Sequence, residues 1–182
     1  MSLVHEDSQI SQDSQMTIID EDRHEILYFA YGSNMSTAQM RQRCPYSTPI
    51  GLGFLPGWRW IINERGYANI VQQDSQTGGG VYGLLYLLPP RDEDALDIFE
   101  GVGYYYEKSK VEVTWQLDGE KKAIGGGNGQ VVRALVYMDE ERTVPAAPLE
   151  EYIQRMETAI EDAVENWGLD RAYAAELRRF WA

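Results

Sequence analysis

Two short motifs contain residue types that could carry out chemistry together. Residues 28–34 read Tyr-Phe-Ala-Tyr-Gly-Ser-Asn, an apolar run that reaches a glycine and continues into residues typical of a helix start. Glu100 lies far downstream, directly before Gly101 and Val102. A strand that turns at glycine into a helix presents unpaired N–H groups and the positive end of the helix dipole, and small anions bind there. With a carboxylate to transfer protons, the two motifs predict a catalytic pocket.

The supply of nucleophiles and metal ligands is small. Cys44 is the single cysteine, which excludes an internal disulfide and a cysteine-cluster zinc site. His5 and His24 are the only histidines, and both precede the first expected strand. A Ser-His-Asp or Cys-His site would have to recruit one of them. We therefore expect carboxylate and backbone chemistry without metal or cofactor, and we expect Cys44 to be a small buried apolar residue.

Length and charge narrow the class of protein. The chain has 182 residues, of which 43% are hydrophobic, enough for one domain with a single core. Its net charge of −13 opposes binding to nucleic acid or to an anionic membrane surface. No run of about 18 apolar residues is present and the first residues are acidic and polar, so we expect neither a membrane span nor a secretory signal. These features favour a cytoplasmic enzyme that acts on a small molecule.

The first 25 residues differ in composition from the rest of the chain. They contain seven acidic residues and one arginine, together with repeated serine and glutamine. Such a segment buries too little apolar surface to offset the entropy lost on ordering. We expect residues 1–25 to form a disordered acidic tail, the alternative being an ordered partner-binding tail, and residues 26–182 to form a single domain.

Periodicity and turn signals predict the elements that position the two motifs. The pattern of Ser36 and Gln39 matches a capping box, so a helix is expected from there to just before Pro45. A second helix is expected from Asp92 as N-cap to Gly101, which places Glu100 at a helix C-terminus. Strands are expected over residues 26–31, 50–54, 57–63, 67–71, 81–88, 104–115 and 131–138, the second to fourth of them as a meander.

The C-terminal part of the chain predicts two more helices. The first has apolar residues at helical spacing over residues 149–167, and the second is capped by Asp170. These helices are expected to serve as scaffold. Strands interspersed with a few helices favour an α+β domain with a sheet capable of curling into a barrel.

Several segments together resemble the γ-glutamylcyclotransferase family. They are residues 28–34, 55–60, 67–70, 81–86 and 100–102, with Tyr106, Pro148 and Tyr152, in one order over about residues 26–155. The resemblance implies an α+β fold, a small closed mixed β-barrel flanked by helices. It also implies a cofactor-independent reaction in which the α-amine of a γ-glutamyl amino acid or peptide attacks its own γ-carbonyl. The products would be 5-oxoproline and the free amino acid.

The resemblance also implies roles for individual residues. Glu100 is expected to be the general acid and base, with its pKa raised by the helix dipole and by walls formed from Phe99, Tyr104, Tyr105 and Tyr106. The residues expected to bind substrate are Tyr28, Phe29, Ala30, Tyr31, Gly32, Ser33, Asn34, Tyr106 and Tyr137. The backbone from Tyr31 to Ser33 is expected to hold the glutamyl α-carboxylate or to polarise the carbonyl. Purely structural roles for Gly32, Tyr106 and Tyr137 stay open.

Two other interpretations remain. A related cyclotransferase could act on a γ-glutamylamine or another γ-glutamyl conjugate, although relatives of that type resemble Tyr-Gly-Thr-Leu at the turn and this chain has Asn34. A non-catalytic module could bind a γ-glutamyl metabolite, but binding alone does not require Glu100. The sequence leaves open the leaving group, whether glutathione itself reacts, and whether the protein is a monomer or a homodimer.

Overall fold

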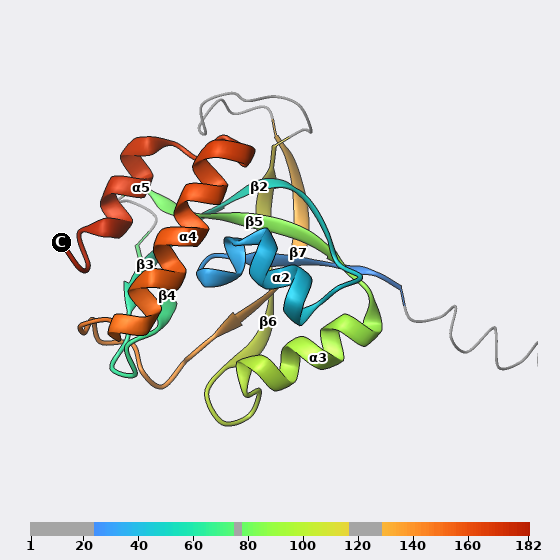
Figure 1. Ribbon diagram of the computed structural model, residues 1–182, viewed down its shortest axis with the longest axis horizontal. Helices are drawn as coiled ribbons and strands as arrows, with labels where there is room; N and C mark the ends of the chain where they lie inside the picture. The colour runs from blue at the N-terminus through green and yellow to red at the C-terminus, as the bar shows by residue number, and fades with distance from the viewer. Residues whose placement is uncertain (1–23, 75–77, 117–128) are drawn as a thin grey trace, which may run out of the picture.

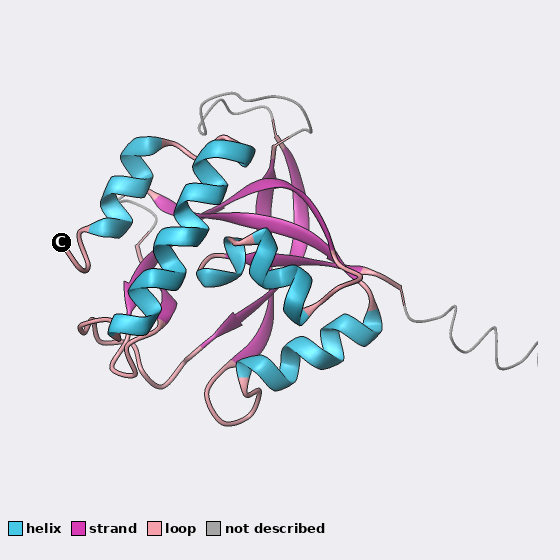
Figure 2. Cartoon of the chain, viewed as in Figure 1, coloured by secondary structure: helices cyan, strands magenta, loops and turns pink. Residues whose placement is uncertain are grey.

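The architecture is a small β-barrel with helices around it (Figures 1 and 2). The computed structural model describes residues 24–74, 78–116 and 129–182, so the predicted tail lies almost entirely outside it. The strands are β1 (Ile26–Ala30), β2 (Thr48–Pro56), β3 (Trp58–Ile62), β4 (Ala68–Gln72), β5 (Gly80–Leu88), β6 (Glu107–Trp115) and β7 (Gln130–Met138). The helices are η1 (Ser33–Met35), α2 (Thr37–Arg43), α3 (Pro90–Glu100), α4 (Glu150–Trp167) and α5 (Arg171–Arg178).

The barrel is closed and mixed, as predicted. Its strand order in the described ranges is β1-β5-β2-β6-β7, and β1 closes it by pairing in parallel with β7 where Tyr28 meets Leu135. The other pairs are antiparallel. The predicted meander is wrong, because β3 and β4 form a separate hairpin and β2 pairs with β5 and β6 instead.

Helix α4 packs against the short turn η1 that follows β1 (Figure 1). Its apolar stripe, which includes Tyr152, Met156 and Ile160, is buried, and the helix ends at Gly168 in the left-handed conformation. The N-terminus of α2 is joined to it by hydrogen bonds from Thr37 to Asp162. Ser36 caps α2 by accepting the Gln39 N–H, which confirms the predicted cap. The capping box is not completed, because the Gln39 side chain donates to Ser33 and Asn34 instead.

Helix α3 begins three residues earlier than predicted. The expected N-cap Asp92 is wrong, because Pro89 takes that position and Pro90 starts the helix with its φ already suited to it. The Asp92 carboxylate is buried and accepts the Tyr46 N–H at 2.8 Å. The end is as predicted, with Gly101 at φ 59° as the left-handed cap that leaves Glu100 in the last turn.

The segment between α3 and β6 is a tight turn, so the strand predicted from residue 104 is wrong in its first three residues. Gly101 and Gly103 both have positive φ, and the Tyr105 N–H donates to the Gly101 carbonyl at 2.9 Å. Helix α3 partly covers the polar face of β6, because Lys108 of β6 forms ion pairs with Glu93 and Asp97 of α3. The turn directs successive tyrosines to different surroundings.

Candidate active site

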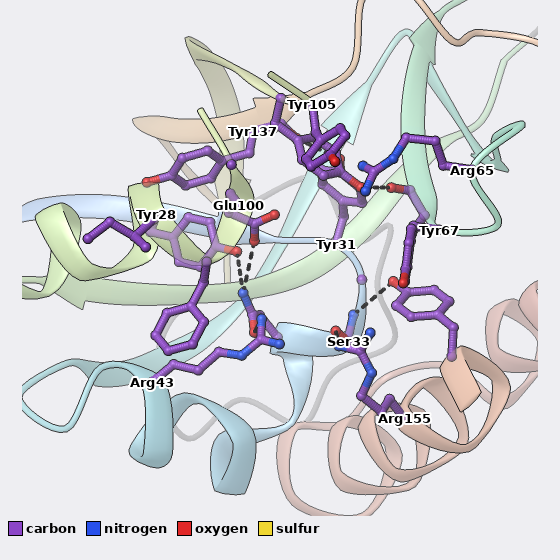
Figure 3. A pocket seen from close by; sticks show the side chains of 18 residues that line it. Tyr28, Tyr31, Ser33, Arg43, Arg65, Tyr67, Glu100, Tyr105, Tyr137 and Arg155 are labelled. Atoms are coloured by element: carbon purple, nitrogen blue, oxygen red, sulfur yellow. Dashed lines mark hydrogen bonds between the residues drawn. The ribbon is translucent and has the colours of Figure 1, made fainter. Parts of the chain in front are cut away.

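A cavity of about 270 Å³ lies where β1, η1, the end of α3, the β3–β4 turn and the start of α4 meet (Figure 3). Most of the residues predicted to form the site line it: Tyr28, Tyr31, Gly32, Ser33, Asn34, Glu100, Tyr106 and Tyr137. Phe29 and Ala30 do not, because they belong to β1 and are completely buried in the core. The two motifs, 66 residues apart at Asn34 and Glu100, therefore meet in one pocket.

Glu100 has the surroundings of a proton-transfer group. Its carboxylate is partly buried at the C-terminus of α3, and the Asn34 side-chain amide donates to its Oε1 at 3.2 Å. Burial raises the pKa of Glu100 to about 7, against the opposing effect of the positive charges of Arg43, Arg155 and Arg65. The predicted upward pKa shift thus has burial as its main cause.

Asn34 orients the carboxylate of Glu100. Its Nδ2 also donates to the Tyr28 hydroxyl at 3.1 Å, and its Oδ1 accepts from Gln39 Nε2 at 2.8 Å and Arg43 Nη1 at 3.3 Å. With both ends of the amide bonded, the side chain cannot rotate without breaking several contacts. Its side chain therefore holds Glu100, and because Asn34 also lines the cavity, its contact with substrate stays a prediction.

The glycine turn is arranged differently from the exposed helix start that the sequence predicted. A single 3-10 turn, η1, separates it from α2, and the Thr37 N–H at the start of α2 donates to Asp162 Oδ2 at 2.8 Å. A carboxylate of the protein itself thus occupies that helix terminus. Within the turn, the Ser33 N–H donates to the Tyr152 hydroxyl at 3.3 Å. A Cβ on Gly32 would lie 2.8 Å from that hydroxyl, so glycine is what lets Tyr152 approach.

The three consecutive tyrosines after α3 have distinct positions. Tyr104 is 84% exposed and lies outside the cavity, so the prediction that it forms a wall is wrong. Tyr105 is half-exposed and lines the rim of the cavity. Tyr106 lies inside the cavity, and its hydroxyl donates to the Ala68 carbonyl at 2.9 Å. Tyr137 donates in the same way to Asp97 Oδ1 at 2.6 Å. Both hydroxyl protons are thus bonded to the protein, while the rings face the cavity.

Sequence reasoning missed the cations of the site. Arg43 comes from the end of α2, Arg65 from the β3–β4 turn and Arg155 from α4, and all three line the cavity. Arg155 forms an ion pair with Glu151 at 3.1 Å. Tyr67 and Tyr152 were part of the family-like pattern but had no role assigned to them. No local signal marks the arginines, because contacts distant in sequence bring them together.

A metal-binding cluster and a membrane-spanning helix are both absent from the described ranges. No group of three or more histidine, cysteine, aspartate or glutamate residues in them could hold a metal ion. No helix in the same ranges has the length and apolar character needed to cross a membrane. Cys44 is buried, as predicted, and burial raises the pKa of its thiol to about 12, which leaves it unreactive.

The fold and cavity define a closed-barrel domain with a pocket of a size suited to a small molecule. Residues 28–154 match the family described as gamma-glutamyl cyclotransferase, AIG2-like, and the chain therefore belongs to that family. This membership supports a small-molecule enzyme of cyclotransferase type. The predicted resemblance and the predicted fold are confirmed.

Solved structures share the fold. A structure described as a gamma-glutamyl cyclotransferase is 24% identical, with a TM-score of 0.68 over 85% of this chain and 86% of that one. The human protein loc79017 is 23% identical, with a TM-score of 0.68 over 85% and 87%. YkqA from Bacillus subtilis is 23% identical, with a TM-score of 0.66 over 91% of this chain and 57% of YkqA. No curated protein sequence matches the chain significantly.

Proposed function

We propose that this protein converts γ-glutamyl amino acids or short γ-glutamyl peptides into 5-oxoproline and the free amino acid, with Glu100 as general base and acid. The observation that carries the proposal is the state of Glu100, a partly buried carboxylate with a pKa raised to about 7 by burial in a small cavity. A group that ionises near neutral pH can both accept and return a proton at modest cost. The family to which the chain belongs supports the same reaction class.

The proposed reaction needs no nucleophile from the protein. The substrate carries both the amine that attacks and the carbonyl that is attacked, so the pocket has only to fold it into a ring-closing conformation. Oriented intramolecular reactions of this kind reach effective molarities on the order of 10⁵ M or more. The protein side chains then act on protons and charge, and the reaction balances without an oxidant, reductant or cofactor.

The movement of protons explains why a carboxylate of raised pKa is useful. The α-nitrogen starts as an ammonium with three protons and ends as a lactam N–H, while the amide nitrogen gains two protons and leaves as an ammonium. The new C–N bond forms and the old C–N bond breaks at the same carbonyl carbon. Glu100 can carry the protons one at a time, because a carboxyl group with a pKa of about 7 is present in both its charged and its neutral form near neutral pH.

Tyr152 is placed to stabilise negative charge on the reacting carbonyl. Its hydroxyl oxygen accepts the Ser33 N–H, which leaves its own proton available for a ligand in the cavity it lines. Burial raises the pKa of Tyr152 to about 12, so it remains a donor throughout the neutral range. We propose that the glutamyl group binds along Tyr31 to Ser33, with the Tyr152 hydroxyl and the turn sharing the substrate oxygens.

The direct test is formation of 5-oxoproline from a panel of γ-glutamyl compounds. We expect turnover by the parent protein and a loss of about 10³-fold or more in Glu100→Gln, which keeps the shape of the side chain but cannot carry the proton. Glu112→Gln is the matched control, since Glu112 is an exposed carboxylate on β6 outside the cavity. Parent-like turnover by Glu100→Gln would exclude Glu100 as the base, and binding without turnover by the parent would favour a non-catalytic module.

A further inference from the structure

Arg65 is the cation of the cavity whose hydrogen-bonding groups remain available to a ligand. Its guanidinium lies 3.6 Å from the centroid of the Tyr105 ring and 5.1 Å from that of Tyr67 (Figure 3). In residues 24–74, 78–116 and 129–182, no carboxylate forms an ion pair with it. Stacking between aromatic faces holds the planar fork in place while its edge stays free for a carboxylate.

The backbone that carries Arg65 is fixed in position. The Arg65 N–H donates to Asn63 Oδ1 at 3.1 Å, and Asn63 is itself completely buried and bonded to Asp139 at 3.2 Å. The next residue, Gly66, has φ 85°, and its carbonyl accepts the Leu149 N–H at 3.1 Å. The turn is thus held against the start of α4, so Arg65 is presented to the cavity in a preorganised way.

The other two arginines are already engaged. Arg43 donates to Asn34, which in turn donates to Glu100, and Arg155 is paired with Glu151. The glutamyl α-carboxylate shares a carbon atom with the ammonium group that must reach Glu100, so it belongs beside Arg43 and Asn34. Arg65 lies across the cavity from Arg43 (Figure 3), at a position that the far end of a substrate would reach.

Charge balance favours an anionic leaving group. Three arginines line the cavity against Glu100, and Glu151 balances one of them. A γ-glutamyl amino acid has two carboxylates and one ammonium group, whereas the γ-glutamyl derivative of a simple amine is a neutral zwitterion. The surplus positive charge of the cavity matches the first compound better than the second.

We propose that Arg65 binds the carboxylate of the departing amino acid. This inference rests on the proposed function, because it names the residue that binds the leaving group of that reaction. Tyr105 and Tyr67 act by holding the guanidinium in the plane that a carboxylate meets with two hydrogen bonds. Arg65 is thereby a specificity-determining residue at the opposite end of the cavity from the proton transfer.

The test compares γ-glutamyl-alanine with γ-glutamyl-alaninamide, which differ only in a terminal carboxylate or carboxamide. We expect kcat/KM of the parent for 5-oxoproline formation to favour the acid by about tenfold or more. Arg65→Gln is expected to lose most of that preference by slowing the acid, with the amide changed by about twofold at most. Arg59→Gln is the matched control, because Arg59 is an exposed arginine on β3 of the same hairpin and does not line this cavity.

The outcomes separate this inference from the function beneath it. No 5-oxoproline from either compound with the parent protein would refute the proposed function, whereas turnover of both at equal rates would refute only the role of Arg65. Equal slowing of both compounds by Arg65→Gln would leave the preference for the acid intact, and it would therefore overturn the role of Arg65. Arg65→Lys retains the charge in the same turn, so it should keep more of the preference for the acid than Arg65→Gln does.

Discussion

The two ends of the cavity each present an arginine, and the two arginines are held by different forces. At one end Arg43 hydrogen-bonds to Asn34, which bonds to Glu100 and to Tyr28, so a connected polar network fixes the carboxylate that we propose transfers protons. At the other end the guanidinium of Arg65 lies 3.6 Å from the centroid of the Tyr105 ring. The N–H groups of Arg65 are left for a ligand. Networks of hydrogen bonds fix geometry closely, whereas stacking fixes a plane and tolerates variation along it.

This difference suits the two halves of the γ-glutamyl substrates that we propose. The glutamyl half is the same in every substrate and must be placed accurately for ring closure. The leaving half varies in its side chain but keeps its carboxylate. A rigid end for the constant half and a stacked cation for the variable half would give accurate chemistry with broad tolerance of leaving groups.

The largest difference between the two ends of the cavity is expected in the kcat/KM of Arg43→Gln. Loss of Arg43 removes the cation that most favours ionised Glu100, so the pKa of Glu100 should rise further above its ordinary value. We expect kcat/KM to fall by about 30-fold for γ-glutamyl-alanine and for its amide alike. Steady-state rates of the two compounds measure this. A loss confined to the acid would mean that Arg43, and not Arg65, contacts the leaving carboxylate.

The next effect concerns the stability cost of the proton-transfer end. The pKa of Glu100 is raised from 4.5 to about 7, so between these values the folded protein retains a proton that the unfolded chain has lost. The free energy of unfolding therefore decreases as the pH rises through this window, by about 3 kcal/mol in total. Glu100→Gln carries no charge and should be more stable than the parent by about that amount near pH 8, and equally stable near pH 4.

Urea unfolding at the two pH values checks this prediction, with Glu112→Gln as the control. Glu112 is exposed on β6, so its replacement should change the free energy of unfolding little at either pH. A stability gain in Glu100→Gln that was the same at both pH values would show that ionisation of Glu100 carries no such cost.

The smallest effect on kcat/KM is expected at the end of the cavity that holds Arg65. Tyr105→Leu removes the ring that contacts Arg65 and should lower kcat/KM for γ-glutamyl-alanine by about fivefold, with little change for the amide. Tyr104→Leu serves as its neighbouring control, because Tyr104 is 84% exposed and outside the cavity. Identical rates for the two variants would show that stacking on Tyr105 does not position Arg65.

The sequence predicted those parts of the fold that local interactions decide. The cap at Ser36, the left-handed glycines at the ends of α3 and α4, and the strand patterns all depend on neighbours within a few residues. It was wrong where tertiary contacts or backbone conformation compete with pattern. The buried Asp92 carboxylate serves the Tyr46 N–H instead of a helix cap, and two glycines turn the chain where a strand of tyrosines was predicted.

The residues of the candidate site also fall into those that the sequence predicted and those that it did not. Glu100 and the glycine turn could be predicted because each is a contiguous motif with a family-like pattern. Arg65 and Arg155 could not, since they meet only after the β3–β4 turn docks on α4, where Gly66 bonds to Leu149. Their chemistry depends on a contact more than 80 residues apart in the chain, which no local spacing encodes.

The pH dependence of kcat/KM for 5-oxoproline formation tests most directly whether Glu100 transfers the proton. Because kcat/KM reports groups that ionise in the free protein and free substrate, its rising limb should follow Glu100. We predict a rise centred near the pKa of about 7 that burial gives this carboxyl, and a shift of that limb to higher pH in Arg43→Gln. A rising limb at the ordinary carboxyl value of 4.5, or one unmoved by Arg43→Gln, would contradict the proposed role of Glu100.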